Sequence, residues 1–194
     1  MTGDFWRWIF PGITKISLGL KQSGHTSAMI AFMLGDSDSA AILSSLPPDI
    51  EAEKDSHITL LYLGKVVDIE DSRDTILSEL ENFAVNSQPI TGLISGVGRF
   101  LNDEGNGTNA IYASFDSPEL PAFRESLVQM IQATGIGIES THGFTPHITL
   151  AYIPKDSSMP NVDIPIIKIM FSSIYLVWGD KHFEFGFVPI EETA

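Results

Sequence analysis

A six-residue pattern, H-I-T-L-x-Y, occurs twice in this chain and constrains its fold more than any other feature. The two copies begin at His57 and His147 and end at Tyr62 and Tyr152. Such an internal repeat indicates a duplicated unit with one histidine in each copy. Residues two apart in a strand point to the same face, so each histidine shares a side with the threonine of its own copy.

The segments around the repeat predict an α+β fold. Apolar and β-branched runs indicate strands, and the segments with apolar residues at helical spacing indicate helices. We expect strands over 28–34, 57–67, 89–101, 110–115 and from 147, helices over 40–46, 68–83 and from Ser117-Pro118 to Gly135, a turn at 102–107, and a closing hairpin of 165–178 with 182–189. Few helices and the expected hairpins favour mainly antiparallel sheet.

Duplication predicts two lobes with flanking helices and a central cleft. A pseudo-twofold axis between the lobes would turn His57 toward His147 across that cleft. We expect one bilobal domain over 25–194, with halves of about 25–105 and 106–194, preceded by an arm or tail at 1–24. The aromatic start of that arm either docks on a protein partner or packs as a strand on the domain itself, and the second interpretation is favoured.

Composition limits the partners. The chain has 194 residues, 43% of them hydrophobic, no cysteine, and a net charge of −14. A chain of this length can bury a sizeable core, and the lack of cysteine excludes disulfides and thiol chemistry. The acidic balance argues against a long nucleic acid, because such partners need a broad basic face. The apolar runs are too short to span a membrane, the first residues do not form a secretory signal, and the cytoplasm is the expected location.

The paired motifs suit in-line displacement at a phosphorus atom. One neutral histidine would take a proton from the attacking oxygen, and one protonated histidine would give a proton to the leaving oxygen. Thr59 and Thr149 would donate hydrogen bonds to the phosphate oxygens. This chemistry needs no metal or other cofactor, and the sequence leaves open which histidine is the acid.

Two alternatives compete with this interpretation. His57 and His147 could be half-buried strand residues that are repeated only by descent from a duplicated fold. A metal site is weaker, because each motif supplies one nitrogen and the nearest further ligands, Glu139 and His142, lie in one half only.

Four aromatic residues are candidates to stack on a nucleobase: Phe144, Tyr62, Tyr152 and Trp178. In a plain strand, both tyrosines would point away from their histidines, so core packing is favoured for them. Phe144 lies in the loop that enters the second motif, where packing and binding are about equally expected. Trp178 is expected to pack more often than to bind.

The two H-x-T-hydrophobic motifs resemble the signature of the 2H phosphoesterase superfamily, also described as the RNA-ligase-like or cyclic phosphodiesterase fold. The resemblance covers about 27–189, and the segment from His25 is also similar to 2H domains of tailed-phage proteins. It implies metal-independent hydrolysis, or reversible ligation, of phosphodiesters with a 2′ linkage or a cyclic phosphate. It further implies His57 and His147 as the acid/base pair and Thr59 and Thr149 as phosphate ligands.

The predicted function is therefore a phosphodiesterase that acts on a 2′-5′, 2′,3′-cyclic or cyclic-oligonucleotide linkage. Some phage members of the superfamily degrade cyclic nucleotides that bacteria use as immune signals, and a phage-encoded chain would work in the host cytoplasm. The alternative is a module that keeps the fold but only sequesters nucleotides, or that docks on a phage structural protein through 1–24.

Overall fold

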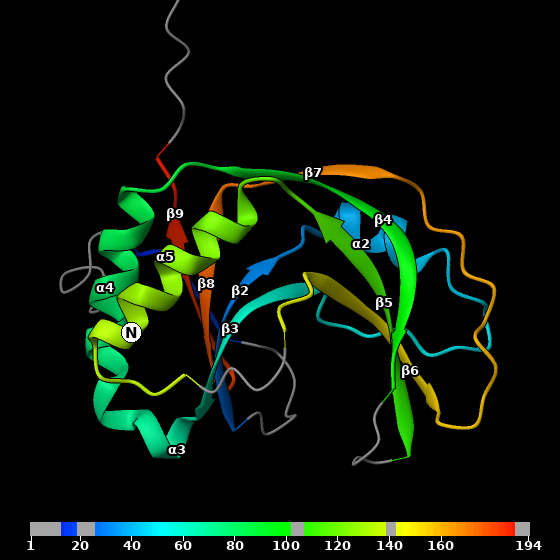
Figure 1. The fold of residues 1–194 in the computed structure, drawn as a ribbon, viewed down its shortest axis with the longest axis horizontal. Coiled ribbons are helices and arrows are strands. Elements are labelled where there is room, and N and C mark those ends of the chain that lie inside the picture. The colour runs from blue at the N-terminus through cyan, green and yellow to red at the C-terminus, as the bar shows by residue number, and fades with distance from the viewer. Residues whose placement is uncertain (1–12, 19–25, 102–106, 139–142, 189–194) are drawn as a thin grey trace, which may run out of the picture.

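The computed structural model describes residues 13–18, 26–101, 107–138 and 143–188. Short helices and nine strands make up this part of the chain (Figure 1). The strands are β1 (Ile13–Leu18), β2 (Ser27–Met33), β3 (His57–Lys65), β4 (Ile90–Phe100), β5 (Thr108–Asp116), β6 (His147–Pro154), β7 (Ile167–Phe171), β8 (Ser173–Trp178) and β9 (Lys181–Gly186). The helices are α2 (Asp36–Leu43), α3 (Val66–Ile69), the 3-10 turn η1 (Glu70–Ser72), α4 (Arg73–Val85) and α5 (Leu120–Ala133).

The strands form two antiparallel sheets. The five-stranded sheet has the order β1-β9-β8-β2-β3, and the four-stranded sheet has the order β6-β5-β4-β7. The two repeat-bearing strands, β3 and β6, are the outer strands of their own sheets and approach each other. The predicted α+β class with mainly antiparallel sheet is confirmed.

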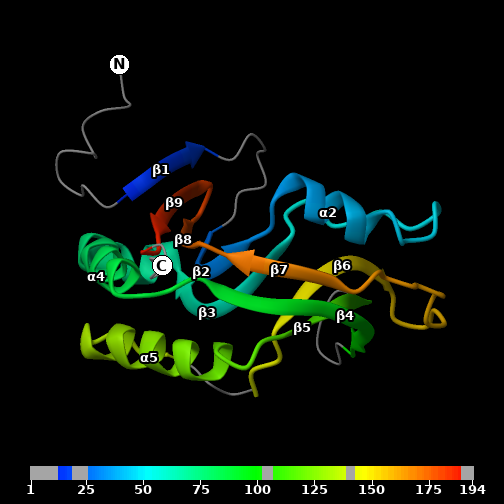
Figure 2. The same cartoon turned by 90° about the horizontal axis from the view of Figure 1, so that it is seen from above.

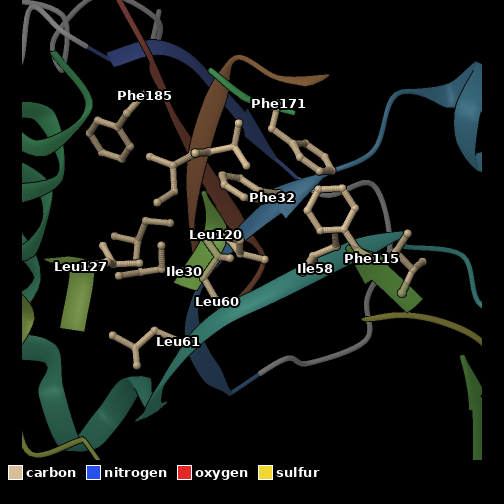
Figure 3. Close-up of a cluster of buried hydrophobic side chains, with 14 of the residues drawn as sticks. Ile30, Phe32, Ile58, Leu60, Leu61, Phe115, Leu120, Leu127, Phe171 and Phe185 are labelled. Atoms are coloured by element: carbon tan, nitrogen blue, oxygen red, sulfur yellow. The ribbon is translucent and has the colours of Figure 1, made fainter. Parts of the chain in front are cut away.

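Helices α4 and α5 lie side by side against the five-stranded sheet, and α2 lies beside the other sheet (Figure 2). The core is continuous between the sheets, as the side chains in Figure 3 show. Phe32 of β2 stacks on Phe171 of β7 with ring centroids 4.5 Å apart, so one aromatic pair joins the two sheets. Apolar burial of this kind is the main force that holds the lobes together.

Each of the two sheets contains strands from both predicted halves of the chain. β4 belongs to 25–105 but pairs in the four-stranded sheet, while β8 and β9 belong to 106–194 but pair in the five-stranded sheet. The predicted strand over 165–178 is also wrong as a single element, because it divides at Ser172 into β7 and β8 of different sheets. Within the predicted arm, β1 pairs with β9, and the other residues of 1–24 lie outside the described part.

Three helix boundaries differ from the expectation. The helix predicted over 68–83 is interrupted by η1, and α4 starts only at Arg73. The polar residues at 36–39 form the first turn of α2 itself, where acidic side chains suit the positive end of the helix. α5 starts at Leu120 with Glu119 as its cap residue, and the Ser117 hydroxyl donates to the Glu119 carboxylate.

Candidate active site

Both repeat histidines are the first residues of their strands, and the strands alternate as expected. His57 and Thr59 are half-buried, whereas Ile58 and Leu60 between and after them are buried. β6 repeats this pattern with His147 and Thr149. The histidine and threonine of each motif therefore share the face that is turned away from the apolar core.

Each imidazole is held by the same backbone contact. The Nδ1 of His57 donates to the carbonyl oxygen of Asp55 at 2.6 Å, and the Nδ1 of His147 donates to that of Thr145 at 2.7 Å. A carbonyl oxygen only accepts hydrogen bonds, so Nδ1 carries the hydrogen in both rings. The proton that each ring can exchange is then the one at Nε2.

Both motif strands carry a bulge directly after the threonine, which corrects the prediction for the tyrosines. The register of β3 against β2 shifts between Thr59 and Leu61, and β6 shifts against β5 between Thr149 and Ala151. Such a bulge puts one extra residue on the strand. Leu60 and Leu61 are consequently both buried, as are Leu150 and Ala151.

The bulge reverses the alternation for the residues beyond it. Tyr62 and Tyr152 therefore lie on the same face as their histidines, and they are 54% and 57% exposed. Core packing, the favoured interpretation, is wrong for both tyrosines. Trp178 is only 4% exposed and belongs to the core, so stacking on a ligand is wrong for that residue.

At each bulge, the carbonyl oxygen of the leucine accepts a hydrogen bond from another part of the chain, and the donor differs between the two bulges. The Nε of Arg124, on α5, donates to the carbonyl oxygen of Leu60 at 2.9 Å. The backbone N–H of Glu53 donates to the carbonyl oxygen of Leu150 at 2.7 Å, beside a bridge between Ala52 and Ala151. The loop before β3 thus extends the sheet of the other motif strand.

Phe144 packs under the same arginine. The guanidinium carbon of Arg124 lies 4.3 Å from the centre of the Phe144 ring, and both side chains are half-buried. Burial lowers the pKa of Arg124, although a guanidinium stays charged at neutral pH. One side chain of α5 therefore contacts the first motif strand and the loop that enters the second.

The surroundings of the two histidines are not equivalent. The His147 ring is 4.7 Å from the Phe100 ring and 5.5 Å from the Tyr112 ring, and these two aromatic rings stack on each other at 4.2 Å. The cross-strand neighbour of His57 is Met33. Burial, and secondarily repulsion from His57, lower the pKa of His147, partly offset by its hydrogen bond to Thr145.

β3 and β6 contact each other, and each begins with its histidine on the face turned away from the core. Two Nε2 atoms and two threonine hydroxyls are thus presented on facing edge strands, an arrangement that can move a proton on and off a bound phosphate group. Thr59 at present donates a weak bond to the Met29 sulfur at 3.5 Å. Among the described residues, no three His, Cys, Asp or Glu side chains gather into a metal-binding group, and Glu139 and His142 lie outside that part.

Sequence reasoning missed three residues of this site. Phe100 and Tyr112 could have been found by pairing residues outward from the predicted 102–107 turn, which places Phe100 opposite Ala110 and Tyr112 opposite Gly98. A side chain at Gly98 would collide with the Tyr112 ring, so this glycine makes room for it. For Arg124 the sequence carries no signal, because its contacts depend on how α5 is placed.

A family model described as the 2′-5′ RNA ligase superfamily matches residues 39–179. The chain belongs to this superfamily, which confirms the resemblance to the 2H phosphoesterases. No curated protein matches the chain in sequence. No helix in the described part is both long and apolar enough to cross a bilayer.

Solved structures share the fold at low sequence identity. TT0787 of Thermus thermophilus has a TM-score of 0.62 and 18% identity, covering 85% of this chain and 100% of its own. E. coli LigT complexed with 3′-AMP has a TM-score of 0.60 and 16% identity, with coverages of 84% and 98%. The MHV ns2 PDE domain has a TM-score of 0.54 and 15% identity, with coverages of 78% and 98%.

Proposed function

We propose that this protein is a metal-independent phosphodiesterase that hydrolyses a nucleotide phosphodiester by paired-histidine catalysis. One observation carries the proposal: both motif histidines are anchored through Nδ1 in the same way and keep Nε2 for proton transfer. Membership in the 2′-5′ RNA ligase superfamily supports it. The linkage would be 2′-5′, 2′,3′-cyclic, or part of a cyclic oligonucleotide.

The reaction is an attack of water on phosphorus. The Nε2 of a neutral histidine accepts a proton from the water as its oxygen bonds to phosphorus, and the bond from phosphorus to the leaving oxygen breaks. The Nε2 of the other, protonated histidine donates its proton to that leaving oxygen. The products are a phosphomonoester and a hydroxyl group, and both histidines have exchanged protonation states.

The unequal surroundings of the histidines assign these roles. The Phe100 and Tyr112 rings contact His147 and remove part of the water around it, and this burial lowers its pKa, which favours the neutral form that accepts a proton. The cross-strand neighbour of His57 is Met33 and not an aromatic ring, so the remaining role, that of the acid, goes to His57. We therefore assign His147 as the base and His57 as the acid in hydrolysis.

The threonines would bind the phosphate. Thr59 and Thr149 lie two residues after the histidines on the same face, so their hydroxyls can donate to the non-bridging oxygens. Thr59 would exchange its weak bond to the Met29 sulfur for a stronger one to a charged oxygen. Tyr62 and Tyr152, exposed on this face, are the aromatic residues best placed to stack on a base.

A compact nucleotide suits the charge of the molecule. A net charge of −14 opposes a long nucleic acid but not a small ligand in a local site. Structures of E. coli LigT, which shares this fold, are complexed with 3′-AMP, ATP and NADP+. We infer a cytoplasmic role, in the host cell if the chain is phage-encoded, where the substrate would be a nucleotide immune signal.

The test is turnover of a panel of nucleotides in the presence of EDTA. The panel holds 2′,3′-cyclic nucleotides, 2′-5′ dinucleotides, and cyclic di- and trinucleotides. Turnover that disappears in His57→Ala and in His147→Ala is the expected result. Activity that requires added metal would overturn the mechanism. Tight nucleotide binding without any turnover would instead identify a nucleotide-sequestering module.

A further inference from the structure

The tyrosine is the third side chain, after the histidine and the threonine, that both copies of the repeat place on the face turned away from the core. Each copy presents histidine, threonine and tyrosine in the same order along its strand, whereas the residue before the tyrosine differs, Leu61 in β3 and Ala151 in β6. Each tyrosine reaches the histidine face only because both strands carry a bulge at the same position.

The two tyrosines extend the site in two directions from the phosphate position. With the bulge residue discounted, each tyrosine lies one same-face step, roughly 7 Å, beyond its threonine. β3 and β6 contact each other and run in opposite directions from the histidines at their first residues (Figure 1), so these steps lead away from the shared phosphate position on opposite sides of it. A phosphate bound between the two motifs would therefore lie at the middle of this arrangement, with an aromatic ring at each end.

Both rings are accessible and positioned. Tyr62 is 54% exposed, and its hydroxyl donates to the Ser27 hydroxyl at 3.4 Å, which holds the ring at the strand pair β2–β3. Tyr152 is 57% exposed and forms one wall of an open hollow of about 230 Å³, completed by Glu51, Glu53 and Lys54 of the loop before His57. Flat aromatic surface of this kind stacks on any base.

We propose that the substrate carries a nucleoside on each side of the scissile phosphate, with one base stacked on Tyr62 and the other on Tyr152. This inference rests on the proposed function and narrows it to dinucleoside phosphodiesters, linear or cyclic. A mononucleoside 2′,3′-cyclic phosphate has one base and can engage only one of the tyrosines. Its phosphate would still reach the histidines, so it is a poorer substrate and not an excluded one.

The hollow beside Tyr152 makes the two ends unequal. Glu51 and Glu53 offer carboxylate oxygens at its rim, with Lys54 paired to Glu51 at 3.8 Å. Carboxylates accept hydrogen bonds, so a base with amino or imino N–H groups along its edge suits this end better than one that presents only acceptors.

The experiment compares three phosphodiesters: a 2′-5′ dinucleotide, a 2′,3′-cyclic mononucleotide, and bis(p-nitrophenyl) phosphate, which has no base. Tyr62→Ala and Tyr152→Ala are each expected to lower kcat/KM for the dinucleotide by roughly 5- to 150-fold, relative to the baseless diester. Tyr62→Phe and Tyr152→Phe keep the ring and should restore most of the activity. Val85→Ala, at an exposed apolar position that ends α4, is the matched control.

The cyclic mononucleotide distinguishes a two-base site from a one-base site. It should lose activity in only one of the two alanine variants, whereas the dinucleotide should lose activity in both. A dinucleotide that responds to only one tyrosine, or to neither, would overturn the proposal.

Binding keeps this test separate from that of the proposed function. If the protein hydrolyses none of the three diesters, catalysis has failed, but the dinucleotide affinity of the parent and the two alanine variants can still be measured by calorimetry. Weaker binding in both variants would support the two-base site without catalysis. Affinities equal to that of the parent would refute it.

Discussion

Replacing Arg124 by methionine tests whether one side chain ties the two halves of the site together. The change removes the Nε donor from the carbonyl oxygen of Leu60 and the positive charge from above the Phe144 ring, while a methionine stem keeps much of the apolar packing. A hydrogen bond from a charged donor contributes about 1.5–3 kcal/mol. A cation over an aromatic ring adds about 0.5–1 kcal/mol at a partly exposed site.

Because Arg124 is only half-buried, we take the lower part of that range and expect Arg124→Met to cost about 2–3 kcal/mol. For a chain of this size, the loss corresponds to a fall in Tm of roughly 5–10 °C. Urea unfolding measures the free energy, with the slope compared between variants to check that only the midpoint has moved.

A double-mutant cycle with Phe144→Leu separates the two contacts. The coupling between the two positions should be about 0.5–1 kcal/mol, the share of the ring contact. Arg124→Lys should fall between the parent and Arg124→Met, because it keeps the charge but loses the planar guanidinium. A free energy for Arg124→Met within about 0.5 kcal/mol of the parent, the usual range for an unimportant surface change, would refute this account of the bulge.

Further predictions concern His147 and its neighbours. Phe100→Ala lets water reach the imidazole of His147, so the pKa of His147 should rise. The NMR titration of this histidine and the acidic limb of the pH-rate profile should both move to higher pH. A titration that does not move would contradict the desolvation argument. Burial holds the pKa of His147 below 6.5 in the folded protein, so the unfolded chain binds more protons as the pH falls through 6.5. The free energy of unfolding should therefore fall as the pH is lowered from 6.5 toward the pKa of His147 in the folded protein. This fall should be smaller in His147→Asn, and an equal fall in that variant would exclude His147 as the source. Ser56 is 6% exposed, and its hydroxyl has no hydrogen-bond partner among the described residues. Ser56→Ala should therefore leave the urea midpoint unchanged or raise it. A loss of more than about 1 kcal/mol in the free energy of unfolding would show that the hydroxyl does form a hydrogen bond.

The sequence was sufficient for the elements that have a local cause. The apolar run of β2 and the β-branched run of β3 each predict their strand, and the repeat predicts that His57 and His147 take equivalent positions in matching strands. A glycine within a strand often marks a bulge, and the register of β4 against β5 shifts at Gly96, which lies in the left-handed region at φ 67°. These features depend on neighbours in the chain, which is why pattern reasoning reaches them.

The rest depends on contacts between distant segments. The bulge after Thr59 and Thr149 has no signature in a strand of apolar residues, yet it decides which way Tyr62 and Tyr152 point. The division of 165–178 at Ser172 likewise follows from how the chain passes from one sheet to the other. The partners of His147 and of the Leu60 carbonyl come from β4, β5 and α5, whose placement the sequence does not reveal.

The central claim is that His57 and His147 act as a pair on one phosphodiester, and the rates of the two single alanine variants and the double variant test it most directly. On the best substrate, with EDTA present, each single change should lower kcat by about 10²–10⁴-fold. The kcat of the double variant should be only slightly lower than that of the less active single variant, because neither proton transfer is productive without the other. A single variant that keeps nearly the full rate would contradict the claim.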